Sequence, residues 1–333
     1  MTDSHQIIQL KHILQNDRSA INIIGIDLQI RGYAFIRLNP ELVAQIDNCM
    51  LIMEKFFLQQ ADYKKKFSKQ PIFGYFGVGH KESFRFLTGS RLSEHKLPDD
   101  FNNMKNLIKY VDQIMHAIVL LCSPVLFPNI IAESKKLDIP LFRVDKPWAM
   151  FDVAKYYNDG TRKELNCAEH FDPGLLSLSL RSTEPGLQLK DEYGRWITPP
   201  NDKTIAILWT GKAATIINPK IKPGIHRVVN PTTFGKPRIS MWHEVCVASQ
   251  EHTELLYDKK IDPVKTESKT GIPMTKSMPG SMIGLEPSKI KSESTIPIIK
   301  YDPLTKLKKS ESPHKFPTNM SNSPMFRSYN PIR

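Results

Sequence analysis

Leucine and serine alternate strictly from Leu176 to Leu180, and this short pattern constrains the fold more than any other feature of the chain. Side chains of a β-strand point in turn to opposite faces of a sheet, so the leucines are expected to cover one face and the serines the other. The segments Thr204–Trp209, Ala214–Ile217 and Arg238–Val247 also have strand character, and turns rich in Gly, Pro and Asn separate them. Short strands at this spacing predict a sandwich or jelly roll.

The first 145 residues are mainly helical in pattern. A short strand is expected at Gly32–Ile36, followed by a helix that begins at Asn39-Pro40 and repeats apolar residues at helical spacing. A second helix is predicted to start near Pro98. Between the two helices, Ile72–Gly79 is rich in glycine and aromatic residues, and we interpret it as a loop. This loop lacks the glycine order of a nucleotide-binding turn.

The chain ends in a basic segment without apolar periodicity. Residues 262–333 hold 10 of the 25 prolines, together with 12 Lys+Arg and 6 Asp+Glu, so this tail carries half of the formal net charge of +12. We predict a disordered tail whose charge suits weak, salt-sensitive binding to an acidic partner. Because the other half of the charge is spread over the remaining residues, the basic balance is weak evidence for a nucleic-acid enzyme.

The cysteines and the apolar segments indicate the cellular compartment in which the protein is expected. Cys49, Cys122, Cys167 and Cys246 are widely spaced, which argues against a disulfide framework or a thiolate zinc site and fits a reducing compartment. The polar amino terminus has no signal-peptide pattern, and the most apolar stretch, 114–131, is interrupted by histidine and proline. A cytoplasmic protein without a membrane span is therefore expected.

Three His-x-acid pairs are candidate metal ligands. His80/Glu82 and His252/Glu254 lack a strand context, and we expect both to be solvated surface pairs. His170/Asp172 precedes the alternating strand directly, and residues two apart in a strand share a face. With His226, which begins a later apolar segment, the pair has the composition of the two-histidine, one-carboxylate set that holds iron(II).

Arg238 and Ser240 form a second constellation. They stand two residues apart in a predicted strand whose other face is apolar, so both side chains are expected on one face. A guanidinium binds a carboxylate through two hydrogen bonds, and a neighbouring hydroxyl adds a third. The pair therefore suits a ligand that carries a carboxylate.

With these motifs in place, the chain resembles the iron(II)/2-oxoglutarate-dependent dioxygenases, and specifically the isopenicillin N synthase-like branch. The run from His170 to Leu180, followed by Pro185-Gly186-Leu187-Gln188-Leu189, is similar to the branch's characteristic block. Gly194-Arg195-Trp196, Pro199, Gly211, Asn218, His226-Arg227-Val228 and Arg238-Ile239-Ser240 follow in the family's order, and Tyr156-Tyr157-Asn158 is similar to its tyrosine strand. The resemblance covers about residues 20–250.

The resemblance implies a double-stranded β-helix, mainly β with flanking helices. Residues 1–145 would form a helical, substrate-capping region, residues 146–261 the oxygenase core, and residues 262–333 the tail. By the same resemblance His170, Asp172 and His226 would bind Fe(II), Arg238 and Ser240 the distal carboxylate of 2-oxoglutarate, and Tyr157 would lie near this co-substrate, with O2 as the oxidant. The chain departs from the family at Phe171 and at Lys155.

The resemblance implies hydroxylation or a related oxidation of a C–H bond in a small-molecule substrate, with desaturation and ring closure left open. Candidate substrate contacts are Phe73, Tyr75, Phe84, Arg85 and Phe151. Two alternatives share the fold: an iron oxidase that uses no 2-oxoglutarate, and a catalytically silent binding protein. A nucleic-acid demethylase is disfavoured, because that family has a second arginine where this chain has Glu244. The oligomeric state is left open.

Overall fold

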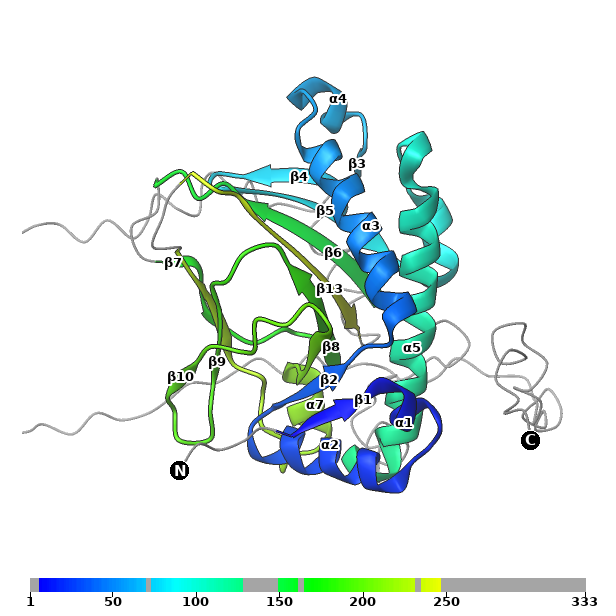
Figure 1. Cartoon of the computed structure of the whole chain (residues 1–333), viewed down its shortest axis with the longest axis vertical. Helices are drawn as coiled ribbons and strands as arrows, with labels where there is room; N and C mark the ends of the chain where they lie inside the picture. Colours follow the sequence, from blue (N-terminus) through cyan, green and yellow to red (C-terminus); the bar gives the residue numbers. More distant parts are fainter. Residues whose placement is uncertain (1–5, 70–72, 128–148, 161–164, 231–234, 247–333) are drawn as a thin grey trace, which may run out of the picture. The chain divides into compact units, whose positions relative to one another are not determined.

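The computed structural model describes residues 6–69, 73–127, 149–160, 165–230 and 235–246. Within these residues the chain forms a nine-stranded sheet, a four-stranded sheet and helices that pack on one side of the larger sheet (Figure 1). The strands are β1 (Ile7–Gln9), β2 (Tyr33–Arg37), β3 (Ser68–Lys69), β4 (Phe73–Val78), β5 (Lys81–Leu87), β6 (Ala149–Tyr156), β7 (Leu165–His170), β8 (Leu176–Ser182), β9 (Leu187–Lys190), β10 (Trp196–Ile197), β11 (Ile205–Thr210), β12 (His226–Val229) and β13 (Arg238–Val245). The α-helices are α1 (Leu10–Leu14), α2 (Arg18–Ile30), α3 (Pro40–Phe57), α4 (Ala61–Lys65), α5 (Asn102–Leu126) and α7 (Lys212–Ile217), and the short 3₁₀ turns η1 (Gly89–Glu94) and η2 (Asp99–Phe101) precede α5.

The topology is that of a jelly roll, as predicted. The larger sheet has the order β1-β2-β11-β8-β13-β6-β5-β4-β3, and the smaller sheet has the order β10-β9-β12-β7. From β7 onward the chain passes repeatedly between the two sheets, because β7, β9, β10 and β12 belong to the smaller and β8, β11 and β13 to the larger. Two facing sheets built in this way enclose the space in which ligands of such folds bind.

The two faces of the larger sheet differ in chemistry. Leu176, Leu178 and Leu180 of β8 belong to the main hydrophobic core, together with Ile239 and Met241 of β13. The alternate residues of these strands, which include the serines of β8 and both Arg238 and Ser240, point to the other face, toward the smaller sheet. The predicted alternation is confirmed, and it divides an apolar helix-covered face from a polar interior face.

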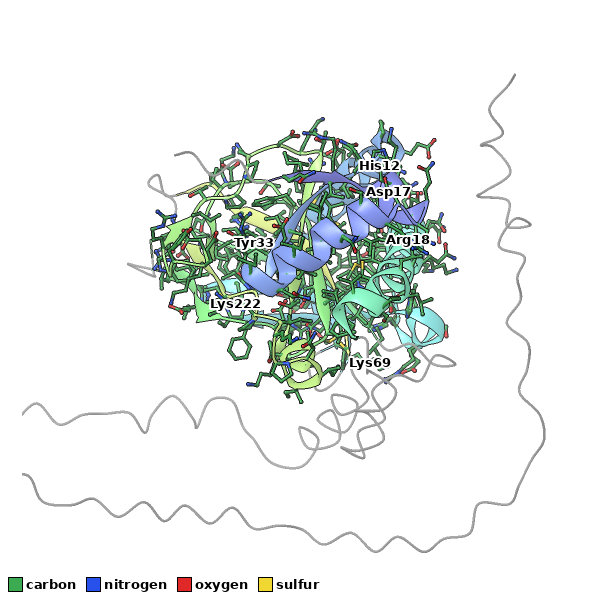
Figure 2. The ribbon with its side chains drawn as sticks, turned by 90° about the horizontal axis from the view of Figure 1, so that it is seen from below. His12, Asp17, Arg18, Tyr33, Lys69 and Lys222 are labelled. Atoms are coloured by element: carbon green, nitrogen blue, oxygen red, sulfur yellow. The ribbon has the colours of Figure 1, made fainter. Side chains whose placement is uncertain are left out.

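The helices begin where their capping residues lie. The Asn39 side chain accepts a hydrogen bond from the Leu42 amide, and Pro40 occupies the first turn of α3, where it displaces no helical hydrogen bond. Asp17 likewise accepts from the Ser19 amide at the start of α2 (Figure 2). The helix expected after Pro98 is present as η2 and α5.

Two predicted elements were wrong. Residues 73–78 of the predicted glycine-rich loop form β4, which pairs with β5 along its length. The glycine at position 74 is needed by the packing, because a Cβ there would lie 2.0 Å from the Phe67 carbonyl oxygen. The predicted strand Ala214–Ile217 is part of helix α7, since Ala213, Ala214 and Ile217 are buried at helical spacing.

The structure describes only part of the three regions predicted from the sequence. Residues before 128 contribute not only helices but also β1 to β5 to the larger sheet. The predicted disordered tail, 262–333, lies outside the described residues, as do the end of the predicted core and the His252/Glu254 pair. The boundaries therefore stay predictions.

One helical segment within the described residues, Asp99–Leu126, is long and apolar enough to cross a membrane by length and composition. It carries α5, whose apolar side is buried against α1, α2, α3 and β13. This packing accounts for the composition of α5, as for the core helix of a jelly-roll protein.

Candidate metal centre

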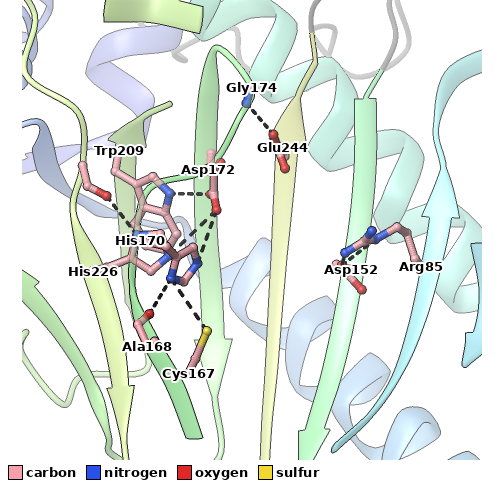
Figure 3. Close-up of polar contacts among 12 residues, drawn as sticks. Arg85, Asp152, Cys167, Ala168, His170, Asp172, Gly174, Trp209, His226 and Glu244 are labelled. Atoms are coloured by element: carbon pink, nitrogen blue, oxygen red, sulfur yellow. Dashed lines mark hydrogen bonds and ion pairs between the residues drawn. The ribbon is translucent and has the colours of Figure 1, made fainter. Parts of the chain in front are cut away.

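Asp172 follows β7 directly and lies in the interior of the jelly roll, where it is 8% exposed. Its Oδ2 atom accepts hydrogen bonds from Ser177 Oγ at 2.5 Å and from Trp209 Nε1 at 2.7 Å (Figure 3). These two donors fix the orientation of the carboxylate plane, because charge-assisted hydrogen bonds are short and directional. The second oxygen of Asp172, Oδ1, is thereby directed toward the two histidines.

His170 and His226 lie at the end of β7 and at the start of β12, and the two residues are paired across the strands. His170 Nδ1 lies 2.8 Å from the Ala168 carbonyl oxygen, and His226 Nδ1 lies 2.9 Å from that of Gly224. Because a carbonyl can only accept, each Nδ1 carries the proton in the neutral ring, and each Nε2 is left with a lone pair.

The three side chains converge on one point. The Nε2 atoms of His170 and His226 lie 3.9 and 3.8 Å from Asp172 Oδ1 (Figure 3), and the ligand atoms of the three residues all lie within 4.8 Å of one another. These distances exceed hydrogen-bond range, so the three groups face each other without bonding. The cluster can hold a metal ion and would leave the other coordination positions open.

The surroundings of the two histidines shift their pKa values in opposite directions. Burial lowers the pKa of His226, although the charge of Asp172 opposes the shift, and this keeps the ring neutral. The Trp209 ring packs on His226 with centroids 4.4 Å apart. The hydrogen bond with Cys167 raises the pKa of His170 to about 9, against the effect of burial.

Two glycines hold the Asp172 turn against the sheet. The Gly174 amide donates to Glu244 Oε1 at 2.7 Å, and a Cβ on Gly174 would lie 2.4 Å from that same oxygen. A Cβ on Gly211 would lie 2.1 Å from the Gly174 carbonyl oxygen. The turn can pack this closely only with glycine at both positions, and it fixes where the Asp172 carboxylate lies.

Residues that support the cluster were missed by the sequence reasoning. Ser177 was identified only as part of the alternating strand, Trp209 only as the end of another strand, and Glu244 only as a departure from a different family. Trp209 could have been recognised as a supporting residue from its place in an otherwise apolar strand, because a buried Trp N–H needs a hydrogen-bond acceptor.

Arg238 begins β13 and is 3% exposed. Its Nε donates to the Glu184 carbonyl oxygen at 3.1 Å, and its guanidinium lies 5.9 Å from the centre of the Tyr156 ring. Burial lowers the pKa of Arg238, although the guanidinium keeps its charge in proteins. Among the described residues it has no carboxylate partner, so it is a buried cation with free donors.

Ser240 lies two residues along β13, on the same face as Arg238 and 8% exposed. Tyr157 does not share that face. Tyr156 pairs with Arg238 across the strands, whereas the Tyr157 ring lies 5.7 Å from Lys155 Nζ on the opposite side. The structure thus brings Ser240 and Tyr156 to Arg238 and leaves Tyr157 away from it.

Four of the five candidate substrate contacts are core residues. Phe73, Tyr75, Phe84 and Phe151 are at most 8% exposed, and their rings pack on other aromatic rings of the core. The fifth, Arg85, lies on the interior face and bonds Asp152 through Nε at 2.8 Å and Nη2 at 2.6 Å (Figure 3).

The expectation that His80/Glu82 is a surface pair was wrong for Glu82, which is 1% exposed. Its carboxylate bonds Lys64 Nζ at 2.5 Å, Tyr75 Oη at 2.9 Å and Lys155 Nζ at 3.1 Å. Lys155, the second departure from the family pattern, is therefore part of a satisfied structural cluster on the helix-covered side. Phe171, the first departure, is 41% exposed.

A groove of about 1000 Å³ opens at the end of β8 and β13. Its lining includes Arg238, Gly186, Ile207 and Lys236, together with residues of α3. The three residues of the metal cluster are not part of this lining. The groove therefore gives access to the Arg238 end of the interior.

Residues 149–247 match the family model of the 2OG-Fe(II) oxygenase superfamily. Clavatol oxidase claD of Penicillium crustosum is 24% identical over 164 residues, which are 45% of this chain and 46% of that protein. The chain thus aligns with about half the length of this curated relative.

Among solved structures, a full-length Neurospora crassa protein in complex with alpha-KG and 5-formyluracil has a TM-score of 0.60 at 17% identity, covering 74% of this chain and 87% of that one. The dioxygenase for auxin oxidation 1 from Arabidopsis thaliana, in its 2-oxoglutarate complex, has a TM-score of 0.58 at 16% identity, covering 73% and 92%. At these identities the structures show a shared fold, and the isopenicillin N synthase-like branch stays a prediction. The family match over residues 149–247 and the shared fold support the 2OG-Fe(II) oxygenase superfamily for this part of the chain.

Proposed function

We propose that the chain is an iron(II)- and 2-oxoglutarate-dependent oxygenase with His170, Asp172 and His226 as the iron ligands. The observation that carries this proposal is the convergence of two Nε2 atoms and one carboxylate oxygen, each with its other polar atom already bonded. Two imidazoles and one carboxylate are the donor set of non-haem iron(II) oxygenases, and outer hydrogen bonds of this kind orient such ligands. The donor chemistry therefore fits the metal that the superfamily uses.

Arg238 and Ser240 would hold the distal carboxylate of 2-oxoglutarate. The Arg238 guanidinium is fully buried and has no acid partner among the residues that the structure describes, which is costly, and a carboxylate that enters the interior would offset that cost. Ser240 lies on the same face and can add a hydroxyl donor. Arg238 begins β13, whereas the turn that carries Asp172 bonds Glu244 near the end of that strand, so the two residues lie toward opposite ends of β13.

When bound, iron and 2-oxoglutarate supply the activation of O2 and the oxidation of a substrate C–H bond. The chain's own residues provide the geometry. Ser177 and Trp209 hold Asp172 turned toward the histidines, and the Ala168 and Gly224 carbonyls hold the two rings. The apolar cluster of Tyr33, Phe35, Leu189, Ile205, Ile207 and Trp209 lies between the sheets and excludes water from that side of the site.

The substrate is proposed to be a small molecule. The similar Neurospora crassa protein was crystallised with thymine and with 5-formyluracil, which are small planar rings. The interior face of this chain offers polar side chains at Arg85, Asp152 and Ser240, in keeping with a small polar ligand. The reaction would be hydroxylation or a related oxidation of a C–H bond.

The experiment is succinate formation by protein loaded with iron(II) under air, measured with 2-oxoglutarate alone and then with a library of metabolites. The proposal predicts slow succinate formation without a substrate, faster formation with the right metabolite, and no succinate from Asp172→Ala. Substrate turnover that does not depend on 2-oxoglutarate would instead identify the iron oxidase of the same fold. Absence of both iron binding and turnover would identify a silent binding protein.

A further inference from the structure

Asp152 holds a buried carboxylate oxygen that nothing in the described part of the chain satisfies. The residue is 2% exposed, and both hydrogen bonds from Arg85 go to the same oxygen, Oδ2. The other oxygen, Oδ1, is buried and has no hydrogen-bond partner among the described residues. Leaving such an acceptor unsatisfied is costly, and native proteins rarely do so without a role for the atom.

The unpaired oxygen belongs to the interior face of the larger sheet. Asp152 of β6 pairs with Arg85 of β5 on one side and with Trp242 of β13 on the other. Its neighbours Phe151 and Val153 belong to the core on the opposite face, so Asp152 points toward the smaller sheet. Figure 3 shows the Arg85–Asp152 pair across β13 from the cluster of Asp172 and the histidines.

The next row of side chains along the sheet is small. Ser83, Ala154 and Ser240 are paired across β5, β6 and β13, and they lie between the Arg85–Asp152 row and the row that holds Tyr156 and Arg238. Small side chains here give the interior face a flat floor beside the charged pair.

The charges of Arg85 and Asp152 determine which kind of ligand the pair can bind. Asp152 neutralises Arg85, so an anion would gain little at this place, in contrast to Arg238. The unmet requirement is a hydrogen-bond donor for Oδ1, and Arg85 Nη1 makes no hydrogen bond among the described residues and can serve an acceptor. The Phe76 ring lies 5.5 Å from the Arg85 guanidinium, and such an aromatic neighbour favours a flat ligand.

We propose that Arg85 and Asp152 form the substrate-binding pair, and that the substrate is a neutral, planar ring with an N–H or O–H group that donates to Asp152 Oδ1. This inference rests on the proposed function, because it treats the interior face next to the metal cluster as the place of the reaction. It narrows the substrate from small molecules in general to lactams, cyclic imides and phenols, and it excludes carboxylates.

The test uses matched probes on the full chain, with binding measured by calorimetry without metal and again with iron(II) and 2-oxoglutarate in the absence of oxygen. The probes are uracil, 2-pyridone and phenol, their methylated counterparts 1,3-dimethyluracil, N-methyl-2-pyridone and anisole, and benzoate. We expect at least one N–H or O–H ring to bind at least tenfold more tightly than its methylated counterpart and than benzoate.

Substitutions of single residues test whether the probes bind at Asp152. Asp152→Asn is expected to weaken the preferred probe at least tenfold and to remove the preference over its methylated counterpart. Asp191→Asn is the matched control, because Asp191 is also buried and also accepts from an arginine, Arg195 Nε at 2.7 Å, but follows β9 of the smaller sheet. It should leave probe binding unchanged. If Asp152→Asn does not fold, the neutral double variant Arg85→Gln/Asp152→Asn keeps the shape of the pair and serves in its place.

The inference is overturned if no probe binds at millimolar concentration, if methylated rings bind equally well, or if the variant that folds binds like the wild type. In those cases Oδ1 holds only a water molecule. Iron(II) and 2-oxoglutarate binding by the same samples separates the two proposals. If those ligands bind while Asp152 has no effect on the probes, the oxygenase proposal stands and the substrate pair fails.

Discussion

Arg238 and Arg85 lie on the same face of one sheet, yet their surroundings are opposite. Arg238 is 3% exposed and has no acid partner among the described residues, so its charge is uncompensated. Arg85 makes two bonds to Asp152, and Glu244 adds a further negative charge nearby, so the pKa of Arg85 is raised despite its burial. Within the part of the chain that the structure describes, Arg85 has a carboxylate partner and Arg238 has none.

This difference indicates how one interior can distinguish two ligands. On the proposed function, a dianionic co-substrate would gain most at Arg238, because its carboxylate would pair with a buried cation. On the further proposal, a neutral molecule would gain most at Arg85–Asp152, where the pair has no net charge and Asp152 Oδ1 has no hydrogen-bond partner among the described residues. Each ligand would then gain more at its own site than at the other, which favours correct filling of the interior.

Replacing Arg238 is expected to have the largest effect. Loss of a buried guanidinium that binds a carboxylate costs about 2–5 kcal/mol, so Arg238→Ala should weaken 2-oxoglutarate binding on the order of 30- to 4,000-fold. The free energy of unfolding should fall by no more than about 1 kcal/mol, because removal of an unpaired buried charge offsets the lost packing. Calorimetry with 2-oxoglutarate and urea unfolding measure the two quantities. Unchanged affinity would place the co-substrate elsewhere.

Arg238→Lys asks whether charge alone is enough at this position. An ammonium group keeps the charge but lacks the planar pair of donors that matches a carboxylate. We expect most of the affinity lost in Arg238→Ala to stay lost in Arg238→Lys, in the same calorimetric assay. Near wild-type affinity in the lysine variant would mean that general charge, and not two-point recognition, holds the co-substrate.

Arg85→Ala should reverse the pattern seen at Arg238. It leaves Asp152 buried without a partner, and breaking such a pair costs about 3–5 kcal/mol when fully buried. Because the Arg85 side chain is 22% exposed, we expect a loss of about 2–4 kcal/mol in the free energy of unfolding. The 2-oxoglutarate affinity should change by no more than about twofold, since distant sites act independently. A stable Arg85→Ala protein with poor 2-oxoglutarate binding would invert the assignment of the two arginines.

Ser240→Ala should have the smallest effect. One hydroxyl hydrogen bond contributes about 1 kcal/mol, so the 2-oxoglutarate affinity should fall about fivefold. Iron(II) affinity should not change, because Ser240 lies on β13 apart from the three converging side chains. A loss as large as that of Arg238→Ala would mean that the hydroxyl and not the guanidinium carries the recognition.

The metal cluster and the strand faces could be predicted from local pattern. His170 and Asp172 are two residues apart, and the alternation at Leu176 to Leu180 defined the faces of β8. The structure confirms the faces of β8 and brings the three side chains together, with His226 paired to His170 across the strands, while their role as metal ligands stays a proposal. Period-two alternation is a strong signal because it follows from backbone geometry alone.

The remaining features depend on contacts between distant parts of the chain. The resemblance named Tyr157, whereas Tyr156 lies beside Arg238, since a shift of one residue moves a strand side chain to the other face. The resemblance suggests Phe84 as a candidate substrate contact, but the packing of α3 and α5 on the sheet makes it a core residue. The Asp152 acceptor could not be predicted, because it exists only through the register of β5 and β6.

The central claim is that His170, Asp172 and His226 form the iron site, and anaerobic iron(II) titration tests it most directly. Wild-type protein and Arg238→Ala should each bind one iron(II) ion per chain with similar affinity, because Arg238 is not a ligand. Asp172→Ala should lose this binding, since two remaining histidines hold iron(II) poorly. Equal iron(II) binding by Asp172→Ala and the wild type would contradict the account.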